Sequence, residues 1–369
     1  MELNKVRLGD FIEVSTANNK TLRYGSDLIR GVTTEGFLRD PKGDVRSVDL
    51  APYKIVRQNA FVYNPSRLDL GSIARCTEEL CIVSHLYIVF YLNAAGLRAI
   101  DPAWLYMYLR RSEFMREVTF RNFGSQRPEF NFKKMSDIEL PLPPIEVQRK
   151  YVAIYEAMLA NQRAYEKGLD DLKLTCDALL DRCKKSKTWE PVGKHLREVD
   201  VRNADGKCDV AYGINIKKEF MLSKASSDDL LKYKLVKPGQ IACNLLHVGR
   251  DASYPIAVNE TGSCIAVSPA YSVFIASNTD MALFLMAWFS RAEIGRNGWF
   301  ICDDSIRGSM AIDRFLSCEI PIPDGKTLKA IAELRTAYWA RARINVYLKA
   351  QLKDICPILI RGSVEEASR

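Results

Sequence analysis

Residues 145–183 read IEVQRKYVAIYEAMLANQRAYEKGLDDLKLTCDALLDRC and carry the longest regular pattern in the sequence. From Tyr151 to Leu179, apolar or aromatic side chains recur at alternating spacings of four and three, and Gln162 is the polar exception in that row. This spacing predicts a continuous helix over Ile145–Cys183 with a heptad seam along one face. At about 1.5 Å per residue the helix is roughly 58 Å long, too long to be buried inside one small domain.

A second, less regular pattern of the same kind lies near the end of the chain, over Thr327–Cys356. Arg341 and Asn345 interrupt its apolar row, and Pro357 is expected to end the helix. Two long helices with apolar stripes bury those stripes most simply against each other, so we expect a coiled-coil pair. The apolar row consists of Ile331, Leu334, Tyr338, Ile344, Leu348 and Ile355.

The sequence partly matches itself when it is shifted by 180 residues (233 minus 53). The matching segments are Tyr53-Lys54-Ile55-Val56-Arg57 with Tyr233-Lys234-Leu235-Val236-Lys237, Ser125-Gln126-Arg127 with Ser305-Ile306-Arg307, and Glu139-Leu140-Pro141-Leu142-Pro143 with Glu319-Ile320-Pro321-Ile322-Pro323. Because the matches share nearly one offset and spread over the whole chain, they indicate a tandem duplication. Each copy ends in one of the long helices.

Before its long helix, each copy shows short runs typical of strands and one shorter helix, which predicts an α/β fold. The expected strands are Phe11–Val14, Tyr53–Val56, Ala60–Tyr63 and Ile82–Leu92 in the first copy, and Ile241–Leu246, Ile256–Val258 and Tyr271–Ile275 in the second. The first copy's helix is expected over Asp101–Val118, with Asp101 as its N-cap and proline in its first turn. Its counterpart is Thr279–Ile294.

Composition excludes several classes of protein. With 369 residues, 47% of them hydrophobic and 27% charged, the chain is of ordinary globular type and long enough for two or three domains. No apolar run reaches the roughly 18–20 residues that a membrane helix needs, and the charged N-terminus is unlike a signal peptide, so we expect a cytoplasmic protein. The formal net charge of +8 suits an anionic partner.

Catalytic and metal-binding motifs are missing from the sequence. No phosphate-binding loop or dinucleotide fingerprint occurs, and the ten cysteines and three histidines do not have the spacing of a zinc site. Asn64-Pro65-Ser66-Arg67 is partly similar to the Asn-Pro-Pro-Tyr motif of adenine methyltransferases, but it lacks the second proline and the aromatic residue. We interpret it as a turn or a polar base contact. Asp303-Asp304 is interpreted as part of a surface loop rather than as a metal site.

Polar and basic residues gather in the loop that follows the shorter helix of each copy. The first loop is Arg121-Asn122-Phe123-Gly124-Ser125-Gln126-Arg127, and the second contains Ser305-Ile306-Arg307. Arginine binds guanine bidentately, asparagine and glutamine bind adenine, and serine contacts phosphate, so the loops are candidate DNA-reading segments. A solvated turn is the alternative interpretation.

The architecture resembles the DNA specificity (S) subunits of type I restriction-modification systems over essentially the whole chain. The most telling stretch is Ile138-Glu139-Leu140-Pro141-Leu142-Pro143-Pro144-Ile145-Glu146-Val147-Gln148, which is similar to the family's proline-rich start of its conserved helix. Gly124-Ser125-Gln126-Arg127 is similar to the small-residue and arginine loop before that start. The second copy departs from the pattern, since Pro321-Ile322-Pro323-Asp324-Gly325 lacks the double proline and the following glutamine.

The resemblance implies two target-recognition domains joined by two helices that pair as an antiparallel coiled coil. It implies a non-catalytic subunit that binds double-stranded DNA and recruits two methyltransferase subunits and, for cleavage, two restriction/translocase subunits. No cofactor is then expected in this chain, because S-adenosylmethionine, ATP and Mg²⁺ belong to the partners. The helices would act as a ruler between two different half-sites, each read by one domain.

The expected domains are residues 1–140 and 185–320 for target recognition, with spacer helices and tail over 141–184 and 321–369. The expected DNA-binding residues are Arg121, Asn122, Ser125, Gln126, Arg127, Asn64, Asn244, Arg250, Ser305 and Arg307. The expected coiled-coil and partner-docking residues are Tyr151, Tyr155, Met158, Leu169, Leu172, Leu179, Ile331, Leu334, Tyr338 and Leu348. Two other functions stay open from the residues alone: a stand-alone DNA-modifying enzyme with a divergent site, and a coiled-coil scaffold that binds no DNA.

Overall fold

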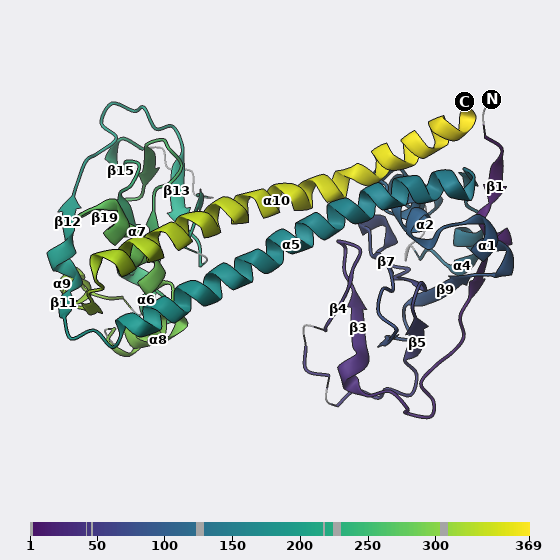
Figure 1. The fold of residues 1–369 in the computed structure, drawn as a ribbon, viewed down its shortest axis with the longest axis horizontal. Coiled ribbons are helices and arrows are strands. Elements are labelled where there is room, and N and C mark those ends of the chain that lie inside the picture. Colours follow the sequence, from purple (N-terminus) through teal and green to yellow (C-terminus); the bar gives the residue numbers. More distant parts are fainter. Residues whose placement is uncertain are drawn as a thin grey trace. The chain divides into compact units, whose positions relative to one another are not determined.

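A computed structural model describes residues 3–41, 43–45, 47–122, 129–216, 218–223, 230–302 and 309–369, with only the backbone described at 247, 249 and 250. The chain divides into two compact units (Figure 1). Unit 1 comprises residues 1–164 and 345–369, and unit 2 comprises residues 165–344. Each unit therefore contains a sheet-rich part together with one half of each long helix, α5 (Ile145–Cys183) and α10 (Gly325–Ser368).

Unit 1 is built from three small sheets and a group of short helices. Its strands are β1 (Lys5–Arg7), β2 (Ile12–Val14), β3 (Ile29–Val32), β4 (Leu38–Arg39), β5 (Lys54–Arg57), β6 (Phe61–Tyr63), β7 (Ile73–Arg75), β8 (Leu80–Val83), β9 (Ile88–Leu92) and β10 (Glu139–Pro141). Its helices before α5 are η1 (Leu8–Asp10), η2 (Ser26–Leu28), η3 (Leu68–Leu70), α1 (Ala94–Ala99), α2 (Pro102–Leu109), α3 (Ser112–Arg121) and α4 (Phe132–Ser136). The strand orders are β2-β9-β6-β7, β4-β3-β8-β5 and β1-β10, with β3 and β8 parallel and the other pairs antiparallel.

Unit 2 repeats this topology strand for strand. Its strands are β11 (Trp189–Pro191), β12 (Leu196–Val199), β13 (Ala211–Ile214), β14 (Phe220–Leu222), β15 (Lys234–Val236), β16 (Ile241–Cys243), β17 (Ile256–Val258), β18 (Ile265–Val267), β19 (Ser272–Ala276) and β20 (Glu319–Pro321). Its short helices are η4 (Val192–His195), η5 (Leu230–Lys232), η6 (Leu245–His247), α6 (Val248–Asp251), α7 (Thr279–Phe289), α8 (Ala292–Phe300) and α9 (Ile312–Leu316). The orders β12-β19-β16-β17, β14-β13-β18-β15 and β11-β20 match those of unit 1, so the structure agrees with the tandem repeat found in the sequence.

The main core of each unit forms around one short helix that is apolar on all sides. In unit 1 this is α2, whose residues from Ala103 to Leu109 are all buried, and in unit 2 it is α7, buried from Met281 to Phe289. The long helices supply part of each core. Leu359 and Ile360 of α10 join the core of unit 1, and Leu180 of α5 joins that of unit 2.

Two expected single helices are each divided in two. The prediction for Asp101–Val118 is wrong at Arg110 and Arg111, which separate α2 from α3, although Asp101 does cap α2 and accepts bonds from the amides of residues 103 and 104. Arg111 is extended, with ψ 147°, and its guanidinium stacks on the Tyr108 ring at 3.7 Å. The counterpart prediction, Thr279–Ile294, fails in the same way at Ser290 and Arg291.

Two expected strands also end early. Ile82–Leu92 is interrupted by a turn in which the Tyr87 amide donates to the Ser84 carbonyl, so that β8 and β9 belong to different sheets. Ile241–Leu246 stops at Cys243, because Asn244 caps the short helix η6. In both cases the apolar run continues through a local turn, and hydropathy alone does not reveal such a turn.

The long helix α5 has the bounds that its sequence pattern predicts, Ile145–Cys183. Helix α10 is longer than expected, and the prediction that Pro357 ends it is wrong, because the helix runs on to Ser368. A proline removes one amide donor and costs about 3 kcal/mol inside a helix. Tertiary packing favours the continuation: Leu359 and Ile360 are buried, and Trp104 Nε1 donates to Ser363 Oγ at 3.0 Å.

The polar residues that interrupt the two heptad seams pair with each other. In unit 1, Gln162 Nε2 donates to Asn345 Oδ1 at 2.9 Å, and both side chains are buried. Lys150 Nζ meets Glu366 at 2.8 Å in the same unit, so the two helix halves run antiparallel there. In unit 2, the Arg341 guanidinium lies 5.5 Å from the centre of the Tyr165 ring. The interruptions are therefore matched contacts between the helices.

Replacing Gln162 by leucine is expected to lower the free energy of unfolding by about 1–3 kcal/mol, because Asn345 then loses its buried partner. The double variant Gln162→Leu/Asn345→Leu should recover most of this loss, since two apolar groups face each other as at other seam positions. Urea unfolding of the unmodified chain, both single variants and the double variant forms a double-mutant cycle, which measures the interaction energy between the two side chains. Strictly additive losses in the double variant would mean that the two amides are not coupled.

Candidate nucleic-acid interface

Half of the expected DNA-binding residues lie outside the described part of the chain. These are Ser125, Gln126 and Arg127 in the first loop and Ser305 and Arg307 in the second. The residues on both sides of each loop are described, and they show how its two ends are held. In unit 1 the loop starts after Asn122 and returns at Glu129, between α3 and α4.

The loop base of unit 1 is closed by two contacts. Lys134 of α4 donates from Nζ to Asn122 Oδ1 at 2.7 Å and to the Glu129 carbonyl at 3.1 Å, so one ammonium group joins both ends of the loop. On the returning side, the Phe130 amide donates to the Pro65 carbonyl at 2.9 Å. The returning side of the loop base is therefore bonded to the turn that follows β6.

Unit 2 has the same construction with different residues. Arg314 occupies the repeat position of Lys134, and its Nη1 donates to the Ile301 carbonyl at 2.7 Å. The Met310 amide donates to the Leu245 carbonyl at 2.9 Å, as Phe130 does to Pro65 in unit 1. Both pairs of residues are separated by 180 positions (314 minus 134, 310 minus 130), so the loop base is part of the duplicated unit.

Asn64 and Asn244 lie beside these loop bases and stabilise turns. Asn64 Oδ1 accepts a bond from the Ser66 amide at 3.0 Å, and Asn244 Oδ1 accepts one from the Leu246 amide at 3.1 Å. This agrees with the turn interpretation of the Asn-Pro-Ser-Arg segment. In unit 2 the following helix α6, which contains Arg250, packs against α8. The structure thus brings each asparagine to the same end of its unit as the loop.

Arg121, the last residue of α3, is held by neighbours. Its Nε and Nη2 atoms bind Glu117 Oε1 at 2.9 and 2.7 Å, and Nη2 also donates to the Asp137 carbonyl at 3.4 Å. The Asn122 amide group meanwhile binds Lys134. These two side chains order the loop base, and a base contact by either of them would require these bonds to change.

Sequence reasoning missed two exposed phenylalanines at the start of the loops. Phe120, near the end of α3, and Phe300, at the end of α8, are each 81% exposed and are 180 residues apart. Trp299 precedes the second one and is also exposed. Large aromatic side chains are seldom left in water at equivalent positions of two repeats unless a partner covers them. Comparison of the two copies, position by position, would have found the pair.

We expect Phe120→Ala and Phe300→Ala each to weaken DNA binding by about tenfold, because an exposed ring beside a DNA-facing loop gains contact area with sugars or bases on binding. Leu97→Ala, which removes an exposed apolar side chain from α1, is the matched control. Fluorescence anisotropy with labelled duplex DNA measures the affinities. If all three variants bind DNA with the same affinity as the unmodified chain, the rings of Phe120 and Phe300 do not contact DNA.

The start of α5 is held by the glutamine of the proline-rich motif. Gln148 is fully buried: its Oε1 accepts from the Asp101 amide at 2.8 Å, and its Nε2 donates to the carbonyls of Ala99 and Pro143 at 2.8 and 2.7 Å. One side chain thus joins the end of α1, the N-cap of α2 and the residues before α5. Its position in repeat two is occupied by Leu328, so only unit 1 has this bond set.

All the expected coiled-coil residues lie in the two long helices, and each is buried or half-buried. Tyr155 and Ile331 are buried, while the rest keep part of their surface. The half-buried residues are Tyr151, Met158, Leu169, Leu172, Leu179, Leu334, Tyr338 and Leu348.

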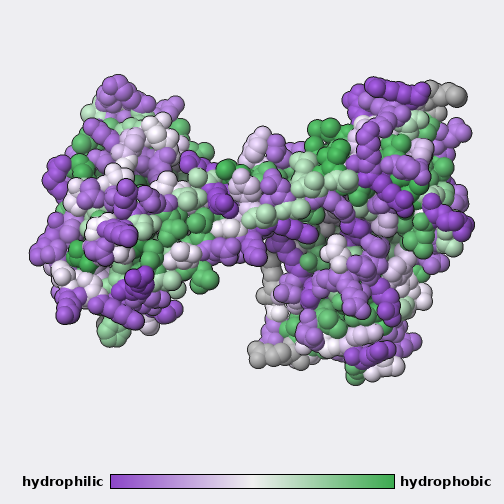
Figure 2. Space-filling model, in the orientation of Figure 1, coloured by the Kyte–Doolittle hydropathy of each residue, from purple (hydrophilic) through white to green (hydrophobic). Residues whose placement is uncertain are grey.

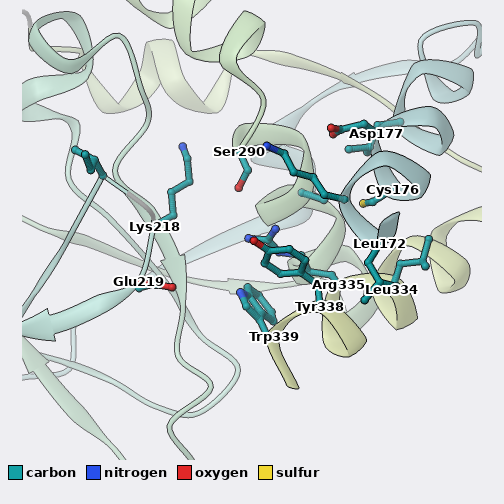
Figure 3. A pocket seen from close by; sticks show the side chains of 14 residues that line it. Leu172, Cys176, Asp177, Lys218, Glu219, Ser290, Leu334, Arg335, Tyr338 and Trp339 are labelled. Carbon is teal, nitrogen blue, oxygen red and sulfur yellow. The ribbon is translucent and has the colours of Figure 1, made fainter. Parts of the chain in front are cut away.

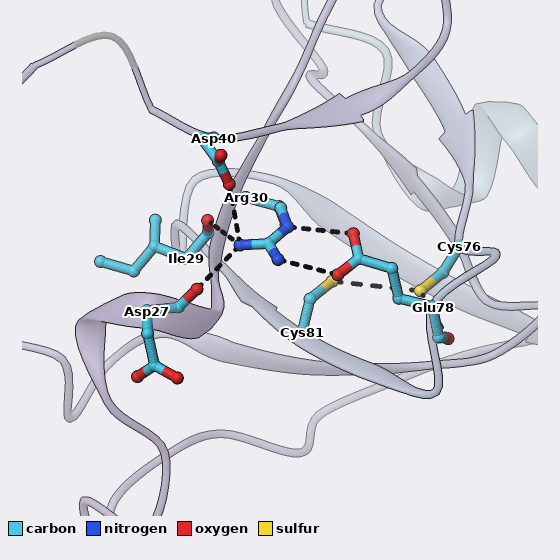
Figure 4. Close-up of polar contacts among 7 residues, drawn as sticks. All are labelled: Asp27, Ile29, Arg30, Asp40, Cys76, Glu78 and Cys81. Atoms are coloured by element: carbon cyan, nitrogen blue, oxygen red, sulfur yellow. Dashed lines mark hydrogen bonds and ion pairs between the residues drawn. The ribbon is translucent and has the colours of Figure 1, made fainter. Parts of the chain in front are cut away.

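The polar cluster in Figure 4 supports the sheet of unit 1. Arg30 on β3 binds both carboxylate oxygens of Glu78 at 2.9 Å and Asp40 at 3.1 Å. Beside it, the buried thiols of Cys76 and Cys81 lie 4.0 Å apart, and the hydrogen bond with Cys76, followed by burial, raises the pKa of Cys81. A buried thiol with a raised pKa is a poor nucleophile. Within the described ranges, no group of histidine, cysteine, aspartate and glutamate residues could hold a metal ion.

The family model of the type I restriction modification DNA specificity domain matches residues 2–172. These residues form a DNA specificity domain of that family. The match confirms the resemblance drawn from the proline-rich motif and, with it, the functional class of a type I DNA specificity subunit. The chain matches none of the curated proteins.

Solved structures of specificity subunits are similar to this specificity protein over nearly its whole length. The S subunit of a type I restriction-modification system from M. genitalium is 12% identical with a TM-score of 0.59, and the match covers 98% of this chain and 96% of that one. This likeness shows a shared fold.

Two more solved structures match over similar lengths at lower TM-scores. The HsdS subunit from Thermoanaerobacter tengcongensis is 14% identical with a TM-score of 0.40, covering 98% and 96% of the two chains. A structure described as the basis of complex assembly and conformational transition of the type I R-M system is 14% identical with a TM-score of 0.49, covering 98% and 97%.

Hydrophilic side chains cover most of the visible face of the protein, with smaller hydrophobic areas among them (Figure 2). Among the residues whose structure is described, none of the helices combines the length and apolar character that crossing a membrane requires.

Proposed function

We propose that this specificity protein reads a bipartite, asymmetric DNA target, one half-site with each repeat. The recognition domains are residues 1–140 and 185–320, and the reading segments are the loops after α3 and α8. The duplicated loop base supports the proposal: Lys134 binds both ends of the first loop and Arg314, at the equivalent position, binds the start of the second, while the loops themselves differ in sequence. Two domains that arose by duplication and read different DNA bases are expected to share the residues that hold the loop ends and to differ within the loops.

We further propose that the chain has no catalytic centre of its own and recruits its partners through the long helices. The partners are two methyltransferase subunits and, for cleavage, two restriction/translocase subunits, which bring S-adenosylmethionine, ATP and Mg²⁺ chemistry with them. The seam residues hold α5 against α10, and the outward faces of the same helices carry exposed apolar side chains that a partner can cover. These are Ile154 and Leu174 on α5 and Ile344, Val346, Tyr347 and Ile358 on α10; for Ile344, the prediction that it belongs to the packed apolar row is wrong.

Mapping methylated sites tests the proposal. The chain is expressed with its methyltransferase in a host free of other adenine and cytosine methylation, and the modified positions are read across the genome. We expect one two-part motif with an unread spacer. Changing the Ser-Gln-Arg stretch of the first loop should alter one half of the motif, and changing Ser305-Ile306-Arg307 should alter the other half. A variant in one loop that alters both halves, or neither, would contradict the assignment of one half-site to each repeat.

The purified chain without partners is expected to transfer no methyl group from S-adenosylmethionine to DNA and to cleave no DNA. Radiolabelled methyl transfer to the mapped target, with and without the methyltransferase, measures this. Methyl transfer by the chain alone would show that it is an enzyme with a divergent site.

A further inference from the structure

Unit 2 contains a partly open cavity of about 290 Å³ between the two long helices and the sheet-rich part (Figure 3). Its walls come from α5, α10, the end of α7 and the turn between β13 and β14. Leu172 and Leu334 supply part of the apolar lining, and three cations, Lys173, Lys218 and Arg335, also line it. This size is at the lower end of the range for small-molecule sites in proteins.

Arg335 is the most unusual residue in the cavity wall. Its guanidinium stacks on the rings of Trp339 at 4.5 Å and Tyr338 at 5.6 Å. Its Nε is buried without a hydrogen-bond partner, and no carboxylate among the described residues forms an ion pair with it. Burial lowers the pKa of Arg335, as expected for a desolvated cation. A buried guanidinium with no carboxylate at ion-pair distance is costly, and each such group in a native protein calls for an explanation.

Lys218 brings a second buried cation to the same cavity. It lies in the β13–β14 turn with a positive φ of 63°, and its Nζ donates to the carbonyls of Tyr254 and Phe289 at 2.6 and 2.7 Å. Carbonyl groups solvate an ammonium ion but do not neutralise it. Burial lowers the pKa of Lys218 to about 8, so it is still mostly charged at pH 7.

Two acidic residues, Asp177 and Glu219, also line the cavity, and Asp177 attracts Arg335 electrostatically, as does Glu260 outside the lining, but neither lies at ion-pair distance from it. Glu219 accepts a hydrogen bond from Asn215 Nδ2 at 3.3 Å. In Figure 3 the side chains of Glu219 and Lys218 leave the same turn and point away from each other. With Lys173, Lys218 and Arg335 against Asp177 and Glu219, the lining carries one excess positive charge.

Unit 1 shows that the fold itself does not require an arginine here. The repeat position of Arg335 is occupied by Tyr155 (335 minus 155 is 180), which is buried and packs against Tyr106 at 6.4 Å. The Tyr106 hydroxyl in turn donates to the Gly36 carbonyl at 2.9 Å. The same place is thus filled by two aromatic rings in one repeat and left as a cation-lined cavity in the other.

We propose that the unit 2 cavity binds a small, freely diffusing oxyanion that bears a phosphate or carboxylate group, with Arg335 as its principal ligand and Lys218 as a second one. The planar guanidinium matches the paired oxygens of such groups, and Figure 3 shows it beside Tyr338 and Trp339 in the cavity wall. Ser290, also in the lining, adds a hydroxyl. Binding would join the β13–β14 turn to both long helices within unit 2 and thereby stabilise that unit.

Thermal unfolding of the full chain in inorganic phosphate tests this, with potassium chloride adjusted to keep the ionic strength constant. We expect a rise in Tm that saturates with phosphate concentration. Arg335→Tyr, which copies the residue of unit 1, should weaken the affinity by about tenfold or more. Lys329→Met removes an exposed cation from the same helix and should leave the response unchanged. Arg335→Met serves as a second variant if the tyrosine variant does not fold.

The control variant separates binding from the general stabilising effect of phosphate ions, which acts on every variant alike and does not saturate. No saturable rise in the unmodified chain, or the same rise in the folded Arg335 variant, would overturn the proposal. Duplex DNA of random sequence tests the other source of phosphate. Arg335→Tyr should bind it with unchanged affinity and salt dependence. A salt slope lower by about one would place a DNA phosphate at Arg335 and overturn the assignment to a free anion.

Discussion

Replacing Gln148 by leucine is expected to lower the free energy of unfolding by about 3–5 kcal/mol, since three buried or part-buried backbone groups lose their partners at once. The change keeps the side chain close in size, so the loss comes from hydrogen bonding rather than from a cavity. Urea unfolding of the full chain measures it. Hydrogen exchange shows where in the chain the stability is lost. The Asp101 amide donates to Gln148, so it should exchange faster in the variant.

Gln351→Leu is the matched control. Gln351 lies on α10, where its Nε2 donates to the Tyr347 hydroxyl at 3.0 Å in an exposed position, and its loss should change stability by less than about 0.5 kcal/mol. Equal effects of the two variants would mean that the α5 start is not held by Gln148. Repeat two reaches the same helix start with Leu328, which packs against the unit 2 core, so a leucine is compatible with the fold once its neighbours are apolar.

The sequence predicted best those features that depend on a long periodic pattern. The bounds of α5 follow from nine seam positions, and a pattern of that length outweighs local irregularities. The duplication was equally accessible, because it rests on matches along the whole chain. Both features are properties of many residues, so no single contact decides them.

Features that depend on one distant contact could not be predicted in this way. Helix α10 continues past Pro357 because Leu359 and Ser363 pack into unit 1, and the chain gives no local sign of it. The break between α2 and α3 lies within an apolar helical pattern, and Arg110 bonds to carbonyls of Thr34 and Gly71 far back in the chain. Tertiary contacts overrode local propensity in both places.

For the candidate site, the residue types predict a DNA-reading segment in each loop, and that role stays a prediction. The pairing of Lys134 with Asn122 and of Phe130 with Pro65 at the loop base requires the fold. Asn64 was interpreted as a turn residue or a polar base contact; the turn bond is present at both asparagines, and their DNA contact stays a prediction. In the seam, Gln162 and Asn345 looked like two separate defects until the antiparallel register placed them opposite each other.

Alanine at both Arg127 and Arg307 is expected to weaken DNA binding by about a hundredfold at moderate salt, roughly tenfold for each arginine, for target and random duplexes alike. Both residues belong to the loops whose bases are built in the same way in the two repeats. Two domains that read different half-sites share a positioning contact more readily than a base contact, so we expect each arginine to bind phosphate. The slope of log affinity against log salt should then fall by about two in the double variant.

Arg98→Ala, which removes an exposed arginine from α1, is the control for the change in net charge. Anisotropy titrations at several salt concentrations, on the mapped target and on a random duplex, separate the outcomes. If either arginine reads a base edge, its single variant should lose about 1–3 kcal/mol on the target only, and methylation should relax at one half-site. Unchanged affinity and unchanged salt dependence in both single variants would mean that the loops do not face DNA. The reading segments would then have to be sought elsewhere in the two units, beginning with the β3–β4 and β13–β14 hairpins, which also occur once in each repeat.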